Sequence, residues 1–433
     1  MPGLKRREIL GIEAFDITEI SGADVLYSPP GIIAESEENA TAIFGTAHSF
    51  YSTEGSTLAI KAMLRLVSAG DVQGERALIL AGRNAHKSFV YAVALLDLDV
   101  EWLFGDEGSH ICECQITPEA LEAALSKTGR RPAAVYITSP DYLGNIADIR
   151  GLCEVADRYG IPLLVDNAHG AYLKFLTPSL HPIDLGASMC ADSAHKTLPV
   201  LTGGAYLHIA KKADRFVDGA RGALSLFAST SPSYLTLQSL DLANAALSDG
   251  YRERLFAVAR RAEDLKKALR SQGFSVCDTE PLKIVISTAS YGYTGDGIAD
   301  ILRKNNVECE FSDRDYIVFM LPAENAGCDF EDLCRLAAAL SEIPRRSPLT
   351  HTLPRIPACE RKMTVREAIF AKCETVASGE AVGRILASPT VSCPPAVPVL
   401  TSGEELTEEA VAALLYYGID KVEVVKMPRR LSE

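Results

Sequence analysis

The chain has 433 residues, of which 47% are hydrophobic and 23% charged, with a formal net charge of −14. This length suffices for a large hydrophobic core and predicts two or three domains. The acidic balance argues against nucleic acid as a partner, because phosphate binding needs a basic face. No apolar run is long enough to cross a bilayer, and the first residues carry no apolar signal-peptide core, so no membrane association is expected.

The chain contains eleven cysteines, an odd number scattered through apolar segments. This distribution favours reduced thiols in a cytoplasmic protein over a disulfide framework. Cys112 and Cys114 form a lone C-x-C without a second cluster at zinc-like spacing, so we interpret them as structural and expect no metal site.

Short apolar runs alternate with helical patterns in the first part of the chain. Strands are predicted over 76–82, 133–140, 161–170 and 203–210. Continuous Val/Ile/Leu runs separated by helices predict a parallel sheet covered on both faces. Ligands of such sheets bind at the carboxyl ends of the strands, and polar residues follow three of the runs there: Asn84, His86, Ser139, Tyr142, Asp166 and His169.

The pattern changes near residue 250. A long amphipathic helix is predicted over 252–273, followed by a smaller α/β unit containing PLKIVIST, GIADILRKNN and YIVFMLPA. The Pro- and Arg-rich stretch 343–357 then separates a last segment. We therefore expect three domains, over 1–250, 251–345 and 346–433.

The stretch TEGSTLAIKAML places a glycine and two hydroxyls at the start of an apolar-periodic helix. The free backbone N–H groups there, with the hydroxyls of Ser56 and Thr57, would bind a phosphate. An ordinary helix N-cap explains the same residues when they are taken alone.

Three further residues each allow two interpretations. Asp166 ends an apolar strand, where it would hold a cationic ring nitrogen or cap the following turn. His86 would lie flat on an aromatic ring or form a loop hydrogen bond. Lys196 lies beside His195 among small and apolar residues, where a neutral lysine would be a nucleophile able to form a Schiff base. Alternatively, it extends from a strand end toward solvent.

Together, these elements match the needs of pyridoxal 5′-phosphate (PLP). Its phosphate needs an anion site, its ring nitrogen needs a carboxylate that keeps it protonated, and its aldehyde needs a lysine. A phosphate-binding helix start, a stacking histidine, a strand-end aspartate and a strand-end lysine occur in that order in the chain.

The sequence resembles the bacterial ornithine/lysine/arginine decarboxylases over nearly its whole length. The motifs that carry the resemblance are MPGLKR, RNAHKS, SPDYLGNIADI, DNAHGAY, DSAHKTLPVLTGGA, STSPSYLTLQSLD and REAIFAKCETVASGEAVGRI. The resemblance implies PLP fold type I, an α/β fold. Its large domain has a mostly parallel seven-stranded sheet covered by helices, and a smaller α/β domain and a C-terminal α+β domain follow. The chain resembles a short form that lacks the N-terminal wing domain of the large members.

The resemblance also implies roles for individual residues. Lys196 forms the Schiff base with PLP and returns a proton to Cα, with His195 as the other candidate donor. Asp166 pairs with the ring nitrogen, Ala168 lies beneath the ring and His86 stacks on its other side. Ser56, Thr57, Ser193 and His195 are expected to hold the phosphate region, and the remaining residues expected at the cofactor are Gly55 and His169.

The hydroxyls of Ser229, Thr230 and Ser231 are implied to reach the phosphate of a neighbouring subunit. A homodimer, at least, would then be needed to complete each site.

The sequence also departs from the family pattern. Leu4 replaces a histidine of the opening motif, and Asp141 replaces the threonine of a Pro-Thr-Tyr motif. The family's Tyr-Pro-Pro-Gly-Ile-Pro is SCPPAVP here, with Cys393 and Ala396, and Ser402 replaces the proline of Pro-Gly-Glu. Several changes fall where the family builds its substrate pocket, so decarboxylation is better supported than any one substrate.

The expected function is PLP-dependent decarboxylation of lysine, arginine or ornithine to the corresponding amine, a step of polyamine biosynthesis. One alternative is an aminotransferase or another PLP lyase, which would need a carboxylate anchor such as Arg355 or Arg384. A catalytically idle homologue that keeps the cofactor is the other alternative.

Overall fold

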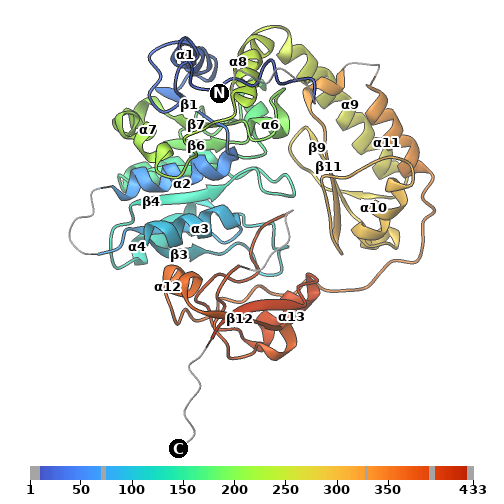
Figure 1. The fold of residues 1–433 in the computed structure, drawn as a ribbon. Helices are drawn as coiled ribbons and strands as arrows, with labels where there is room; N and C mark the ends of the chain where they lie inside the picture. Colours follow the sequence, from blue (N-terminus) through green and yellow to red (C-terminus); the bar gives the residue numbers. More distant parts are fainter. Residues whose placement is uncertain (1–9, 70–74, 327–329, 390–394, 427–433) are drawn as a thin grey trace, which may run out of the picture.

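The computed structural model describes residues 10–69, 75–326, 330–389 and 395–426 (Figure 1). The MPGLKR motif and Cys393 therefore lie outside the described residues. Within this part of the chain, no helix is long and apolar enough to cross a membrane.

The first sheet has seven strands in the order β1-β7-β6-β5-β4-β2-β3. Their bounds are β1 (His48–Ser52), β2 (Leu78–Gly82), β3 (Asp99–Leu103), β4 (Ala134–Thr138), β5 (Leu163–Asp166), β6 (Met189–Asp192) and β7 (Ala205–Ile209). The neighbours from β3 to β6 pair in parallel. The mostly parallel seven-stranded sheet is thus confirmed.

One strand differs from the sequence prediction, which placed 203–210 in a parallel run. β7 pairs antiparallel with both β6 and β1. The connection from β6 to β7 holds only the four-residue helix α6 (Ala194–Thr197) and a Gly-Gly turn. It is too short for the covering helix of a parallel crossover, so the chain reverses locally.

Helices cover both faces of this sheet. On one face lie α2 (Gly55–Ser68), α3 (Lys87–Leu96) and α7 (Val217–Ser225), and on the other lie α4 (Pro118–Lys127) and α5 (Ile149–Arg158). Beyond the β1 edge, α1 (Ile32–Phe44) packs against α8 (Tyr234–Ser248). Because both faces are covered, the strand side chains are buried and only the strand ends are open to a ligand.

The second sheet is antiparallel, in the order β10-β11-β9-β8. Its strands are β8 (Ser275–Val276), β9 (Lys283–Ser287), β10 (Phe311–Ser312) and β11 (Tyr316–Met320), with the helices α9 (Tyr251–Ser271), α10 (Gly295–Arg303) and α11 (Glu331–Ser341). The long amphipathic helix predicted over 252–273 is α9. Its core joins that of α1 and α8 in one buried cluster.

The last part of the chain forms β12 (Cys373–Ala377) and β13 (Lys421–Val425), an antiparallel pair, with α12 (Val365–Phe370) and α13 (Glu408–Tyr416). It lies beside β3 and α3 (Figure 1), where Arg366 donates to the carbonyl oxygens of Ala94 and Leu95. We propose domain boundaries at 250/251 and 345/346, because each sheet then falls within one domain.

Short 3₁₀ turns occur among these elements: η2 (Ala171–Phe175), η3 (Lys211–Phe216), η4 (Ala289–Tyr291), η5 (Ala323–Ala326) and η7 (Ser378–Glu380).

Candidate active site

A cavity of about 220 Å³, here called the central cavity, lies at the carboxyl ends of β4, β5 and β6. It brings together ten of the residues that the sequence singles out: Gly55, Ser56, Thr57, His86, Asp166, Ala168, His169, Ser193, His195 and Lys196. These residues come from segments far apart in the sequence. The strand order brings their ends to one place, as expected for a parallel sheet.

One end of the central cavity is suited to an anion. Helix α2 starts there at Gly55, whose φ of +71° lies in the left-handed region that glycine tolerates. The Ser193 hydroxyl donates to the Ser56 hydroxyl at 2.8 Å, and the hydroxyls of Thr57 and Ser88 are 2.7 Å apart. Unpaired N–H groups of the first helical turn and nearby hydroxyls are the donors that a phosphate requires.

Asp166 lies at the carboxyl end of β5 and is only 2% exposed. Its carboxylate accepts hydrogen bonds from the Tyr136 hydroxyl at 3.1 Å and from the Ala168 amide at 3.2 Å. Burial raises the pKa of this carboxyl, while Tyr136, Ala168 and Lys196 act in the opposite direction. Asp166 therefore caps the turn and also lines the central cavity, and its contact with a cationic ring nitrogen stays a prediction. A cation in the cavity would stabilise its charged form.

Lys196 is held in α6, directly after β6. Its Nζ lies 2.8 Å from His169 Nε2 and 5.7 Å from the centre of the Tyr142 ring. Burial and the Lys196 charge hold the pKa of His169 well below its usual range, so this imidazole is neutral and accepts a hydrogen bond from Lys196. The arrangement gives Lys196 a neutral hydrogen-bond acceptor inside a buried site.

His86 is the N-cap of α3, and its Nδ1 accepts a hydrogen bond from the Ser88 amide. Burial, with Lys196 and Lys87 nearby, lowers the pKa of His86 to about 4. A neutral ring is therefore present at neutral pH, with its proton on Nε2. An uncharged flat ring suits stacking on another aromatic system.

His195 lies on the same short helix as Lys196. Its Nδ1 is 3.0 Å from the Gly204 carbonyl oxygen, which can only accept, so Nδ1 carries the proton. Its pKa is lowered by burial and, less strongly, by Lys196, which leaves the ring mainly neutral.

The wall opposite the large sheet contains residues that sequence reasoning did not assign. The Tyr142 hydroxyl donates to the carboxylate of Glu310 at 3.0 Å, and Glu310 directly precedes β10 in the second sheet. Pro395 and Val397, from the last part of the chain, also line the cavity. No local pattern marks Glu310, whereas Pro395 and Val397 belong to the SCPPAVP segment that departs from the family motif.

Cys112 also lines the central cavity and is fully buried. Its thiol lies among carboxylates, and burial raises its pKa well above the usual value. A protonated, inert thiol agrees with the structural role predicted for it. Cys114, its partner in the C-x-C motif, donates instead to the Leu103 carbonyl oxygen at 3.3 Å.

The structure does not bring Ser229, Thr230 and Ser231 into the central cavity of their own chain, and all three are exposed. The Ser229 amide donates to the Glu54 carboxylate at 2.7 Å. Because Glu54 is the residue before Gly55, this hydroxyl segment begins close to the start of α2, but its side chains do not line the site.

The two arginines considered as carboxylate anchors lie elsewhere. Arg355 pairs with Glu107 at 2.9 Å, and Arg384 pairs with Glu374 at 2.7 Å. No arginine is found among the described residues that line the central cavity. The structure therefore provides no support for an aminotransferase with either arginine as its anchor.

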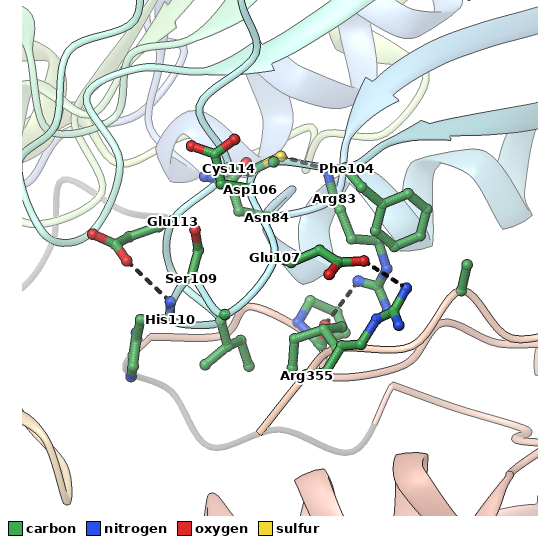
Figure 2. A pocket seen from close by; sticks show the side chains of 16 residues that line it. Arg83, Asn84, Phe104, Asp106, Glu107, Ser109, His110, Glu113, Cys114 and Arg355 are labelled. Carbon is green, nitrogen blue, oxygen red and sulfur yellow. Dashed lines mark hydrogen bonds and ion pairs between the residues drawn. The ribbon is translucent and has the colours of Figure 1, made fainter. Parts of the chain in front are cut away.

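Arg355 borders a larger cavity of about 350 Å³, here called the outer cavity (Figure 2). Arg83, Glu107 and Glu113 are among its other lining residues, and Asn84 lines both cavities. We assign the chemistry to the smaller central cavity, because Lys196, Asp166 and the start of α2 meet there.

Comparisons with known proteins agree with this geometry. The family model for the Orn/Lys/Arg decarboxylase major domain matches residues 10–284, and the model for the C-terminal domain of the same family matches residues 350–428. The chain is 31% identical over 420 residues to the uncharacterized protein YaaO of Bacillus subtilis (strain 168), covering 92% of this chain and 84% of that protein.

An arginine decarboxylase of the same organism is 30% identical over 433 residues, covering 94% of this chain and 86% of the relative. Among solved structures, the constitutive lysine decarboxylase of E. coli superposes with a TM-score of 0.74 at 20% identity, covering 96% of this chain and 76% of that one. This likeness shows the PLP fold type I architecture. The chain therefore belongs to the Orn/Lys/Arg decarboxylase family.

Proposed function

We propose that the protein decarboxylates a basic amino acid, namely lysine, arginine or ornithine, with PLP held in the central cavity. The observation that carries the proposal is the meeting of Lys196, Asp166 and the start of α2 around a single cavity of about 220 Å³. Relatives that bear the names arginine decarboxylase and lysine decarboxylase support the same activity.

The residues present fit PLP by the chemistry of their donors. The start of α2 and the hydroxyls of Ser56, Thr57 and Ser193 would bind the phosphate. Asp166 would bind the protonated ring nitrogen, and Lys196 would bind the aldehyde carbon. When bound, PLP supplies a conjugated ring that accepts the electrons of the bond broken at Cα.

Asp166 would keep the ring nitrogen protonated. Its carboxylate is almost fully buried, so its charge acts in surroundings of low dielectric constant. A ring-nitrogen cation offsets the burial that raises the pKa of this carboxyl, so the two charges stabilise each other. His86 and Ala168 would enclose the ring from its two faces.

Lys196 would carry the proton of the reaction, and His169 would orient it. Neutral His169 accepts a hydrogen bond from Lys196, and because the pKa of this imidazole is held so low, it would hold the amine in place and not take up its proton. Loss of CO₂ leaves Cα in need of a proton. Lys196 would donate it, with His195 as the other candidate donor. The buried site also favours loss of the substrate's carboxylate charge as CO₂.

The negative charge of Glu310 at the edge of the site favours a substrate with a cationic side chain. The carboxylate of Glu310 lies at the edge of the site, hydrogen-bonded to Tyr142, and it raises the pKa of His195 against the effect of burial. Glu310 would attract the distal cation of a basic amino acid.

We also propose that the active unit is a homodimer with composite sites, since exposed hydroxyls at 229–231 suit an anion bound by a partner. A cytoplasmic location is consistent with nine free thiols among the described cysteines.

The test is a product assay with lysine, arginine and ornithine offered in turn to the PLP-loaded protein. We expect CO₂ and the matching amine from one of the three substrates, detected by mass spectrometry. A keto acid in place of CO₂ would indicate an aminotransferase, and no product from any substrate would indicate an idle homologue.

A further inference from the structure

The segment Pro395–Val399, here called the partition, separates the two cavities. Pro395 and Val397 line the central cavity, whereas Pro398 lines the outer cavity. The partition belongs to the last part of the chain, yet it closes a site built on the large sheet. Figure 2 shows the outer cavity, where Arg83 of the large domain and Arg355 of the C-terminal part of the chain lie near each other.

Arg83 holds the partition in place. Its guanidinium donates to the carbonyl oxygens of Pro398 at 2.9 Å and Val399 at 2.6 Å, and it lies 3.7 Å from the carboxylate of Glu404. Arg83 is only 6% exposed, so solvent screens these contacts little. A planar guanidinium that donates to two successive carbonyl groups fixes both the position and the orientation of the backbone.

A second attachment lies next to the ring-stacking histidine. The Lys87 amide donates to the Ala396 carbonyl oxygen at 2.8 Å, which ties the partition to the residue after His86. Ala396 is fully buried and has a φ of +55°, in the left-handed region that residues with a side chain seldom adopt. Such a conformation persists only where the surrounding contacts determine it, and these are often functional sites.

The cofactor would leave one wall of the central cavity to the substrate. The proposed PLP contacts use the start of α2, the ends of β5 and β6, and His86. Lining residues without a proposed cofactor contact include Asn84, Cys112, Tyr142, Pro395 and Val397. A substrate at Lys196 must contact this wall. The polar side of this wall is Tyr142, which is hydrogen-bonded to Glu310. The apolar side of the wall consists of Pro395, Val397 and Cys112.

We propose that Val397 is a specificity-determining residue that limits the length of the substrate side chain, and that Arg83 is the positioning residue that sets its place. The inference rests on the proposed decarboxylation and deepens it. The methylene groups of a basic amino acid would pack on Val397 while its cation lies toward Glu310. Ornithine, lysine and arginine differ mainly in the length of this side chain, so a fixed wall would favour one over the others.

The first experiment compares Val397→Ala with wild type in the PLP-loaded protein. The ratio of kcat/KM for the longest substrate to that for the shortest should rise about tenfold, because removing methyl groups from a pocket changes its selectivity by that order. Val411→Ala is the matched control. It makes the same substitution in α13, at a buried side chain that packs in the C-terminal core, outside the partition and the cavity. Its ratio should match wild type.

A binding measurement supplies a readout other than activity. Calorimetric dissociation constants for 1,4-diaminobutane, 1,5-diaminopentane and agmatine, the amine products, should shift in the same direction in Val397→Ala and remain in the wild-type ratio in Val411→Ala. A wild-type enzyme that decarboxylates none of the three amino acids overturns the proposed function. An active wild type with equal ratios in both variants overturns only the role of Val397.

Arg83→Lys tests the positioning role, because lysine keeps the charge but cannot donate to both carbonyl groups from one plane. We expect the ratio of kcat/KM for the longest substrate to that for the shortest to move toward the value of Val397→Ala. The visible absorbance of the bound cofactor should be retained. A variant that loses kcat equally for all substrates at an unchanged ratio would show that Arg83 only stabilises the fold.

Discussion

The two walls of the central cavity were built in different ways. The wall proposed to hold the cofactor consists of strand ends and a helix start of one sheet, and each of its segments carries its polar residues within a few positions of one another. The opposite wall combines Tyr142, from the loop after β4, with Val397 of the last part of the chain, and Tyr142 is hydrogen-bonded to Glu310 beside the second sheet. The first wall carries the proposed reactive groups on one sheet, whereas the second wall forms where separate parts of the chain come into contact.

Because of this difference, substitutions in the two walls are expected to have different effects. A change at Lys196 or Asp166 alters the chemistry, because each of these residues would touch the cofactor. A change at Glu310 or Val397 alters the space and the charge around the substrate while the proposed cofactor contacts remain. Substrate preference can therefore change while the reaction type stays constant.

The largest effect is expected from Lys196→Ala. The variant should lose all turnover and the visible absorbance of the cofactor bound to lysine, because no other lysine is among the described residues lining the central cavity. Borohydride reduction of the wild type, followed by peptide mass spectrometry, should label Lys196. A label on another lysine would contradict the assignment.

The hydroxyl segment tests whether the proposed cofactor wall is complete within one chain. Thr230→Ala combined with Ser231→Ala should inactivate the enzyme if these side chains bind the partner's phosphate. Mixing this variant with Lys196→Ala under conditions of subunit exchange should restore about a quarter of wild-type activity, since half of the dimers are mixed and each mixed dimer has one intact site. Mixed dimers without activity would place the hydroxyls in their own chain's site or outside both.

Asp166→Asn should weaken cofactor binding and lower turnover by about 10² or more, because the ring nitrogen loses its countercharge. Asp157→Asn is a matched control, since Asp157 is exposed and pairs with Lys212. Titration of the cofactor and initial rates would measure both effects. Near-normal turnover in Asp166→Asn would mean that Asp166 only caps its turn.

The opposite wall should respond more mildly. Glu310→Gln removes a charge but keeps a partner for the Tyr142 hydroxyl. We expect KM for the basic substrate to rise about tenfold, equivalent to about 1.4 kcal/mol, with kcat changed less. Glu308→Gln serves as the control, because Glu308 is exposed and pairs with Arg303. Equal KM values in the two variants would show that Glu310 does not bind the substrate.

The last effect concerns stability beside Tyr142 instead of activity. Burial raises the pKa of Asp141 from 3.8 to about 6 in the folded protein, despite hydrogen bonds from Asn145. The folded state therefore binds this proton more tightly than the unfolded state, and stability falls as pH rises from about 4 to about 6. Asp141→Asn should remove that loss, by about 3 kcal/mol at most above pH 6. Denaturant unfolding at pH 4 and pH 7 should show a gain only at pH 7, and an equal change at both would refute the pKa explanation.

The sequence alone was sufficient to predict which residues of its own chain line the first wall. Strand ends, a helix start and the DSAHKTL motif lie in short segments, and a parallel sheet brings their ends together whatever the details of packing. The antiparallel course of β7 was missed because apolar content does not encode strand direction. Glu310 was missed because no pattern in the residues around it indicates a contact with Tyr142, which lies 168 positions away. Arg83 was missed because its partners lie more than 300 positions further along the chain.

The partition also has a consequence for protein synthesis. The segments that carry Asp166 and Lys196 leave the ribosome long before Pro395 and Val397, so the large sheet can fold while its cavity still lacks one wall. A nascent chain that captured the cofactor early would hold it in a site open to water. The amine of Lys196 would thus be open to small aldehydes, and its bond to the cofactor would be open to hydrolysis, until the last part of the chain is translated and Arg83 has bound the partition. Chains released before residue 395 should consequently bind the cofactor more weakly than the complete chain, which equilibrium dialysis of truncated proteins would reveal.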